Sequence, residues 1–114
     1  MLVSPERFEE LVAEALDGIP AELGARMDNV AVFVEDRARQ AGLLGLYQGV
    51  PLTARDAGYA GMVMPDRITI YRLPICAMCA TEDDVVHQVR VTVVHEVAHH
   101  FGIDDNRLAE LGWA

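Results

Sequence analysis

The feature that most constrains the fold is a helical run from Thr81 to Gly102. Thr81 is a capping residue, and the three acidic residues after it suit the positive end of a helix dipole. Apolar residues, mostly valine, then recur at spacings of three and four, and Gly102 stands where a left-handed C-terminal cap is needed. The pattern predicts one long helix that ends near Phe101 and packs its valine side on a sheet or on another helix.

The first part of the chain predicts a second helix and a strand. Ser4 and Pro5 suit an N-terminal cap and the first helical position, and apolar residues at helical spacing continue to about Asp17. Val30–Glu35 is β-branched and almost entirely apolar, so we expect an interior strand that is covered on both faces. Two further strands are predicted at Leu43–Val50 and Arg67–Leu73.

Shorter segments complete the reading. Pro20–Met27 is expected to add a helical turn, and Asp104 or Asp105 can cap a last short helix. The loop Pro51–Asp66 is long for a small domain and still contains apolar residues, which suggests a cleft wall.

Length and composition fit one α+β domain over residues 1–114. The chain is 52% hydrophobic and 24% charged, as in globular proteins. We expect a small mixed or mostly antiparallel sheet of about three to four strands, packed on the N-terminal helix and the long helix, with a short helix at the C-terminal end.

Charge limits the possible partners. Eighteen acidic residues against nine basic ones give a formal charge of −9, which repels nucleic acid and anionic lipid. All nine basic residues are arginine, so lysine-dependent chemistry is excluded. The sequence shows neither a signal peptide nor a membrane span, and we expect a cytoplasmic protein. It does not predict an oligomeric state.

Two cysteines, Cys76 and Cys79, could form a redox pair or half of a zinc site. The chain has no second cysteine pair, and the residues around these two are apolar. Reduced, partly buried thiols are therefore the favoured interpretation.

His95, Glu96 and His99 form the pattern H-E-x-x-H inside the long helix. Histidines four residues apart lie one above the other, so both imidazoles can reach one zinc ion while the glutamate stands beside them. At about 100° per residue, the histidines fall on the side of the helix opposite Val93 and Val97. The spacing predicts one Zn²⁺ per chain and makes Glu96 the candidate catalytic base.

A catalytic zinc usually has three protein ligands. Asp105 is our choice for the third, because Gly102 lets the backbone leave the helix and turn back toward the metal. Asp104 and Glu110 are the alternatives, and Asp105 could instead cap the last helix.

Together, His95, Glu96, His99, Gly102 and Asp105 resemble the pattern H-E-x-x-H-x-x-G-x-x-D, a variant of the metzincin consensus. With the flanking segments Gly45–Thr53 and Asp66–Tyr71, the chain resembles the short bacterial zincin-like metallopeptidase family over about residues 28 to 112. The resemblance implies a minimal zincin-like fold. It also implies a peptidase in which Glu96 takes a proton from a metal-activated water and passes it to the leaving amine.

Two functions remain open. The first is zinc-dependent hydrolysis of a peptide or protein substrate. The alternative is a non-catalytic zinc-binding module that binds a peptide or a partner protein. An extended peptide can add to an exposed sheet edge in either case. Three other groups of side chains are weaker candidates: His100 as a surface or supporting residue, His87 as structural or exposed, and Tyr47, Tyr59 and Tyr71 for oxyanion stabilisation, with none preferred.

Overall fold

The computed structural model describes residues 1–49 and 65–113. Five helices and a three-stranded mixed sheet make up this part of the chain, which confirms the α+β prediction. In chain order the elements are α1 (Pro5–Asp17), α2 (Ala21–Ala25), β1 (Val30–Glu35), β2 (Gly45–Gln48), β3 (Asp66–Tyr71), α4 (Arg72–Ala77), α5 (Glu82–His100) and α6 (Asp105–Leu111).

The central strand of the sheet is β3, and the strand order is β1-β3-β2. β1 runs parallel to β3, with Val30 opposite Asp66, while β2 runs antiparallel to β3, with Gly45 opposite Ile70. The prediction that β1 is an interior strand is therefore wrong, since it has one neighbour among the described strands.

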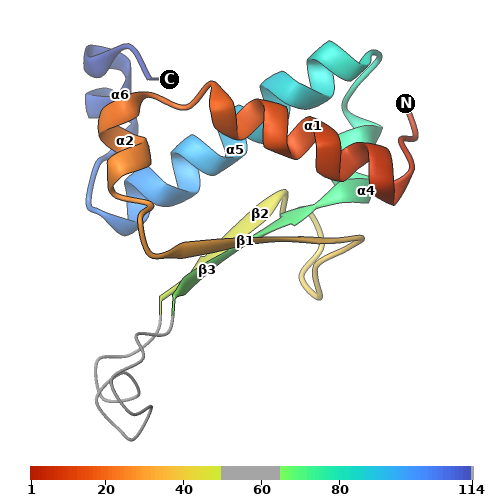
Figure 1. The fold of residues 1–114 in the computed structure, drawn as a ribbon, viewed down its shortest axis with the longest axis horizontal. Helices are drawn as coiled ribbons and strands as arrows, with labels where there is room; N and C mark the ends of the chain where they lie inside the picture. The colour runs from red at the N-terminus through yellow and green to blue at the C-terminus, as the bar shows by residue number, and fades with distance from the viewer. Residues whose placement is uncertain (50–64, 114) are drawn as a thin grey trace, which may run out of the picture.

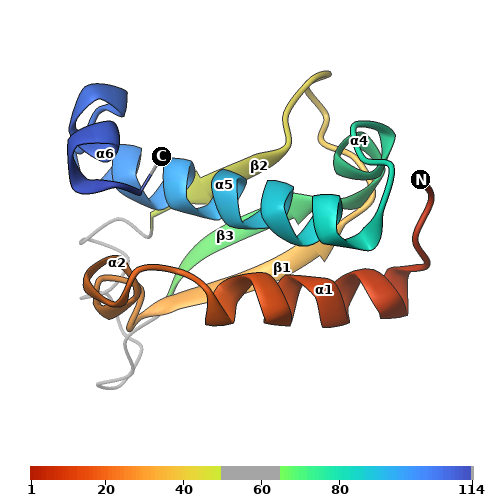
Figure 2. The same cartoon turned by 90° about the horizontal axis from the view of Figure 1, so that it is seen from above.

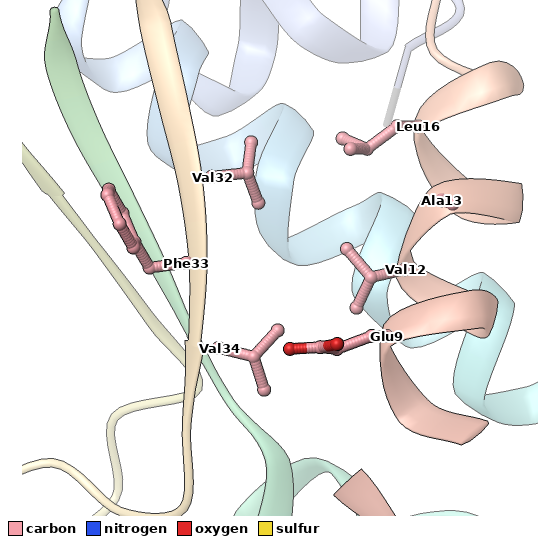
Figure 3. Close-up of a pocket in the computed structure, with 7 residues that line it drawn as sticks. All are labelled: Glu9, Val12, Ala13, Leu16, Val32, Phe33 and Val34. Atoms are coloured by element: carbon pink, nitrogen blue, oxygen red, sulfur yellow. The ribbon is translucent and has the colours of Figure 1, made fainter. Parts of the chain in front are cut away.

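The apolar run in β1 has another cause. Val32 and Val34 point toward α1, and with Val12 and Leu16 they line a hollow of about 360 Å³ (Figure 3). Phe33 points to the other side of the sheet, where its side chain is 43% exposed and lies beneath the guanidinium of Arg67. The strand is thus covered by a helix on one face only.

Helices α1 and α5 lie side by side on one face of the sheet (Figure 1). Seen from above, α1 lies alongside β1, and α5 lies over β2 and β3 (Figure 2). The core between these layers is made of fully buried apolar side chains, chiefly from α1, α5 and β3: Phe8, Leu11, Val89, Val93, Val97, Ile68 and Ile70. No helix in the described part of the chain is long and apolar enough to cross a membrane.

The long helix starts and stops where its sequence predicts. The Thr81 hydroxyl accepts the Asp84 N–H at 3.1 Å, and the Asp84 carboxylate accepts the Thr81 N–H at 3.1 Å, which completes a capping box. At the other end, Gly102 has φ +79°, and the N–H of Ile103 reaches back to the carbonyl of Ala98 at 2.8 Å. This is a Schellman ending, and it turns the chain back toward the helix.

The last predicted strand is shorter than expected, because β3 ends at Tyr71 and α4 follows at once. Pro74 lies in the first turn of α4, where the missing N–H costs no hydrogen bond. The guanidinium of Arg72 fixes this junction by donating to Asp36 at 3.0 Å and to the Val3 carbonyl at 2.7 Å.

Cys76 in α4 and Cys79 just after it are free thiols, as predicted, but they are buried rather than partly buried. Burial, with Asp84 nearby, raises the pKa of the Cys79 thiol. A raised thiol pKa opposes the thiolate that redox chemistry and metal binding need. The predicted cleft wall, Pro51 to Asp66, lies outside the described residues except for its last two positions.

Candidate metal centre

His95 and His99 lie one above the other near the C-terminal end of α5. Their ring centroids are 5.8 Å apart, with an angle of 52° between the ring planes. Val93, Val97 and Ala98, on the other side of the helix, are buried in the core. Because the valine side of the helix packs in the core, the two imidazoles on the opposite side face an open groove.

Asp105 completes the cluster. The Schellman turn at Gly102 brings the chain back, and Asp105 becomes the first residue of α6. One of its carboxylate oxygens lies 3.0 Å from Nε2 of His99. Among the described residues, one ligand atom each from His95, His99 and Asp105 fall within 4.8 Å of one another.

The two alternatives for the third ligand are hydrogen-bonded elsewhere. The Asp104 carboxylate caps α6 by accepting the N–H of Arg107 at 2.8 Å. The carboxylate of Glu110 accepts a hydrogen bond from the Arg107 guanidinium at 3.0 Å. The geometry therefore favours Asp105 as the residue that faces the histidines.

Glu96 is half-buried beside the histidines and lines the same groove. Burial raises the pKa of its carboxyl above the ordinary 4.5, although His99 and His95 act in the opposite direction. A carboxylate whose pKa moves toward neutrality is a stronger proton acceptor. This is the property that a general base at this position requires.

The groove has a volume of about 270 Å³ and runs between α5 and the segment that leads into β2. Leu43, Leu44 and Gly45 form one wall, and Thr92 lies with the site residues on the other. Strand and helix approach closely here, because a Cβ added at Gly45 would lie 2.7 Å from the Thr92 methyl carbon. Glycine at this position therefore sets the width of the groove.

His100 belongs to a side-chain cluster that the sequence did not predict. Its ring stacks on Tyr47, with centroids 3.9 Å apart, and its Nε2 lies 3.7 Å from Asp66. The Tyr47 hydroxyl donates to Asp66 at 2.7 Å. The last turn of α5 is thus tied to β2 and β3 next to His99.

The remaining candidates lie away from the histidines. Tyr71 is buried at the end of β3, and His87 is exposed two turns before His95. Tyr59 lies outside the described residues. Among the described tyrosines, none lines the groove beside Glu96.

The donor set fits a divalent metal ion. Two imidazoles and one carboxylate are typical zinc ligands, and three protein ligands leave a position open for catalysis. The side chains of His99 and Asp105 are 49% and 73% exposed, so an ion can enter from solvent.

Comparison with known proteins agrees with this reading. A family model described as zincin-like metallopeptidase matches residues 27–113. Among solved structures, a conserved hypothetical protein from Thermus thermophilus is 23% identical with a TM-score of 0.55, and the match covers 87% of this chain and 94% of that chain. At this identity the likeness shows the fold alone. A search of curated proteins gave no match.

Proposed function

The chain belongs to the zincin-like metallopeptidase family, and from this premise we propose that it is a zinc-dependent peptidase. His95, His99 and Asp105 are the proposed ligands, and Glu96 is the proposed general base. The observation that carries the proposal is the convergence of one potential ligand atom from each of these three residues, where the two histidines share a groove with the half-buried Glu96. The family and the donor set support zinc as the metal.

When bound, zinc supplies a Lewis acid that polarises a carbonyl and lowers the pKa of water. The protein contributes the proton transfers. Glu96 accepts the proton of the attacking water, and its raised pKa helps it to hold that proton until the amine leaves. The half-buried position also keeps the carboxylate beside the reacting atoms.

The groove beside α5 suits a peptide in an extended conformation. β2 has one strand neighbour among the described strands, so its outer edge offers backbone hydrogen bonds to a peptide. Leu43 and Leu44 supply apolar contacts along the same wall. We therefore expect the substrate to be a peptide or an extended segment of a protein.

Replacing Glu96 tests the proposal. We expect Glu96→Gln to keep one zinc per chain and to lose at least about 100-fold in turnover, because it removes a general base and leaves the ligands in place. Metal content is measured on the purified protein, and hydrolysis is measured on a peptide library. Glu14→Gln is the matched control, since it neutralises an exposed carboxylate of α1 outside the ligand cluster and should leave turnover unchanged.

Two outcomes would contradict the proposal. Retained turnover in Glu96→Gln would remove the base assignment. Zinc binding by the wild-type protein without cleavage of any library peptide would favour the non-catalytic module instead.

A cytoplasmic location forms part of this proposal. The buried free thiols of Cys76 and Cys79 support it, because reduced cysteines are usual in reducing compartments.

A further inference from the structure

The sheet has a second face, which no described helix covers (Figure 1). The strand pairing places Phe33 opposite Thr69, Leu46 opposite Thr69, and Gln48 opposite Arg67 on this face. Between the face and the segment after β1 lies a hollow of about 440 Å³, which is within the size range of ligand sites. Arginines at positions 37, 39 and 67 line it.

Two arginines of this hollow, Arg37 and Arg39, differ from the other described arginines, which all have a polar or aromatic partner. Arg7, Arg72 and Arg107 form ion pairs, Arg90 donates to the Ala15 carbonyl, and Arg26 lies over the ring of Phe101. Arg37 and Arg39 are exposed and have no ion-pair partner among the described residues. Among the described residues, the hollow therefore holds two exposed arginines without an ion-pair partner, beside Arg67, which is paired with Glu35 on the same wall.

The third arginine is held in place. Arg67 lies 4.2 Å above the Phe33 ring, 3.6 Å from the carboxylate of Glu35, and within a 3.4 Å hydrogen bond of the Thr69 hydroxyl. Its aromatic contact fixes the guanidinium plane at the wall of the hollow. The amides of Gln40 and Gln48 add neutral hydrogen-bonding groups around it.

We propose that this hollow, lined by Arg37, Arg39 and Arg67, binds an acidic peptide segment of a partner protein. Guanidinium groups pair with carboxylates through two parallel hydrogen bonds, and Leu43 and Leu46 add apolar contact to the peptide. A nucleic acid fits less well, because a continuous phosphate backbone would meet the repulsion of the whole molecule. A short acidic segment contacts only the basic hollow.

The hollow also adjoins the metal centre. Leu43 lines both this hollow and the groove beside His95, so the two sites meet at this residue. A segment bound on the open face therefore contacts the loop that borders the peptidase groove. The binding proposal does not depend on hydrolysis, and it can be tested with the metal removed.

The probe is a short fluorescein-labelled peptide in which Glu and Ala alternate. Its binding to the protein is measured by fluorescence anisotropy, with a chelator present to remove metal. The salt concentration is about 0.15 M, at which repulsion between the acidic peptide and protein carboxylates more than about 8 Å away is screened. We expect saturable binding to the wild-type protein and a weakening of at least about tenfold in R37Q/R39Q, since two charge-assisted contacts are lost. The matched control R7Q/R107Q has the same change in charge outside the hollow and should bind as the wild type does.

The experiment distinguishes loss of binding at the hollow from loss of the fold and from non-specific binding. Both replaced arginines are exposed and unpaired, so circular dichroism should show an unchanged fold in R37Q/R39Q. Absence of saturable binding to the wild-type protein, or equal weakening in the two double variants, would overturn the proposal. Tighter binding of a labelled oligothymidylate than of the acidic peptide would also overturn it. A Lys-Ala peptide that fails to bind would support it.

Discussion

Two neighbouring aspartates have different roles in this protein. Asp105 faces the histidines, whereas Asp104 caps α6. We expect Asp105→Ala to weaken zinc binding by at least about 100-fold, because it removes a proposed ligand. Asp104→Ala should instead lower the free energy of unfolding by about 1 kcal/mol, as loss of a helix cap does, with a much smaller effect on zinc. Competition with a chromophoric chelator and urea unfolding measure the two effects.

Two results would contradict the different roles assigned to Asp104 and Asp105. Equal loss of zinc affinity in the two variants would contradict the assignment of Asp105 as the ligand. A large loss in Asp104→Ala alone would reverse it.

At the scale of single residues, the candidate metal centre was predicted from local sequence patterns. His95, Glu96 and His99 are fixed by helical spacing, and Gly102 indicates the turn that brings Asp105 back. The sequence could not exclude Asp104 and Glu110 as the third ligand. Its spacing does not show that Arg107 donates hydrogen bonds to both of these carboxylates.

The contacts of His100 could not be predicted in the same way. Its partners, Tyr47 and Asp66, come from two strands far away in the chain. Only the sheet register brings these side chains to the last turn of α5, and no local pattern encodes that register.

The capping box of α5 makes the stability of the protein depend on pH. Hydrogen bonds from the backbone N–H groups of Ala80 and Thr81 lower the pKa of the Asp84 carboxyl below its ordinary 3.8. A lowered pKa stabilises the fold above that ordinary value, and the stabilisation is lost as pH falls through the folded value. We expect Asp84→Asn to lower Tm near neutral pH and to approach the wild-type Tm in acid.

Asp83→Asn is the control for this effect. It removes a charge from the same helical turn without touching the two N–H groups that Asp84 accepts. Thermal unfolding of the three proteins across an acid series gives the comparison. A difference between Asp84→Asn and the wild type that stays constant with pH would contradict the role of the ionised carboxylate.

The contact between β2 and α5 gives a second prediction at the scale of elements. Gly45→Ala should cost about 1–3 kcal/mol of stability, because the new methyl group meets the Thr92 side chain at 2.7 Å. Thr92→Ser removes the opposing methyl group and keeps the hydroxyl that donates to Gln88, so the double variant should recover most of the loss. Urea unfolding of the four proteins forms the double-mutant cycle. Additive effects in that cycle would show that the two side chains do not oppose each other.

A helix was predictable where its sequence contains an N-terminal cap, an apolar face at helical spacing and a C-terminal glycine. α5 has a capping box, a valine stripe and a glycine stop, and the structure places it as the sequence predicts. α4 was missed, because its six residues have no side-chain cap at the N-terminal end and follow directly on a strand. The position of β1 was misread, because Phe33 made a strand covered on one face look apolar on both.

For the molecule as a whole, composition predicts one α+β domain, but it does not predict that the helices gather on one face of the sheet. That asymmetry follows from packing, since α1 and α5 bury their apolar sides against each other and against the same strands. It also leaves the other face open to the hollow that Arg37, Arg39 and Arg67 line, a feature that net charge alone does not predict.

The strand order has a consequence for how the chain acquires its structure during synthesis. β1 and β2 are made first, yet among the described strands each pairs only with β3, which emerges last. No two of the described strands can therefore pair until Tyr71 has left the ribosome, and the packing of α1 against α5 comes later still. Early fragments cannot fold stepwise, so the protein should reach its native state in one late, cooperative event.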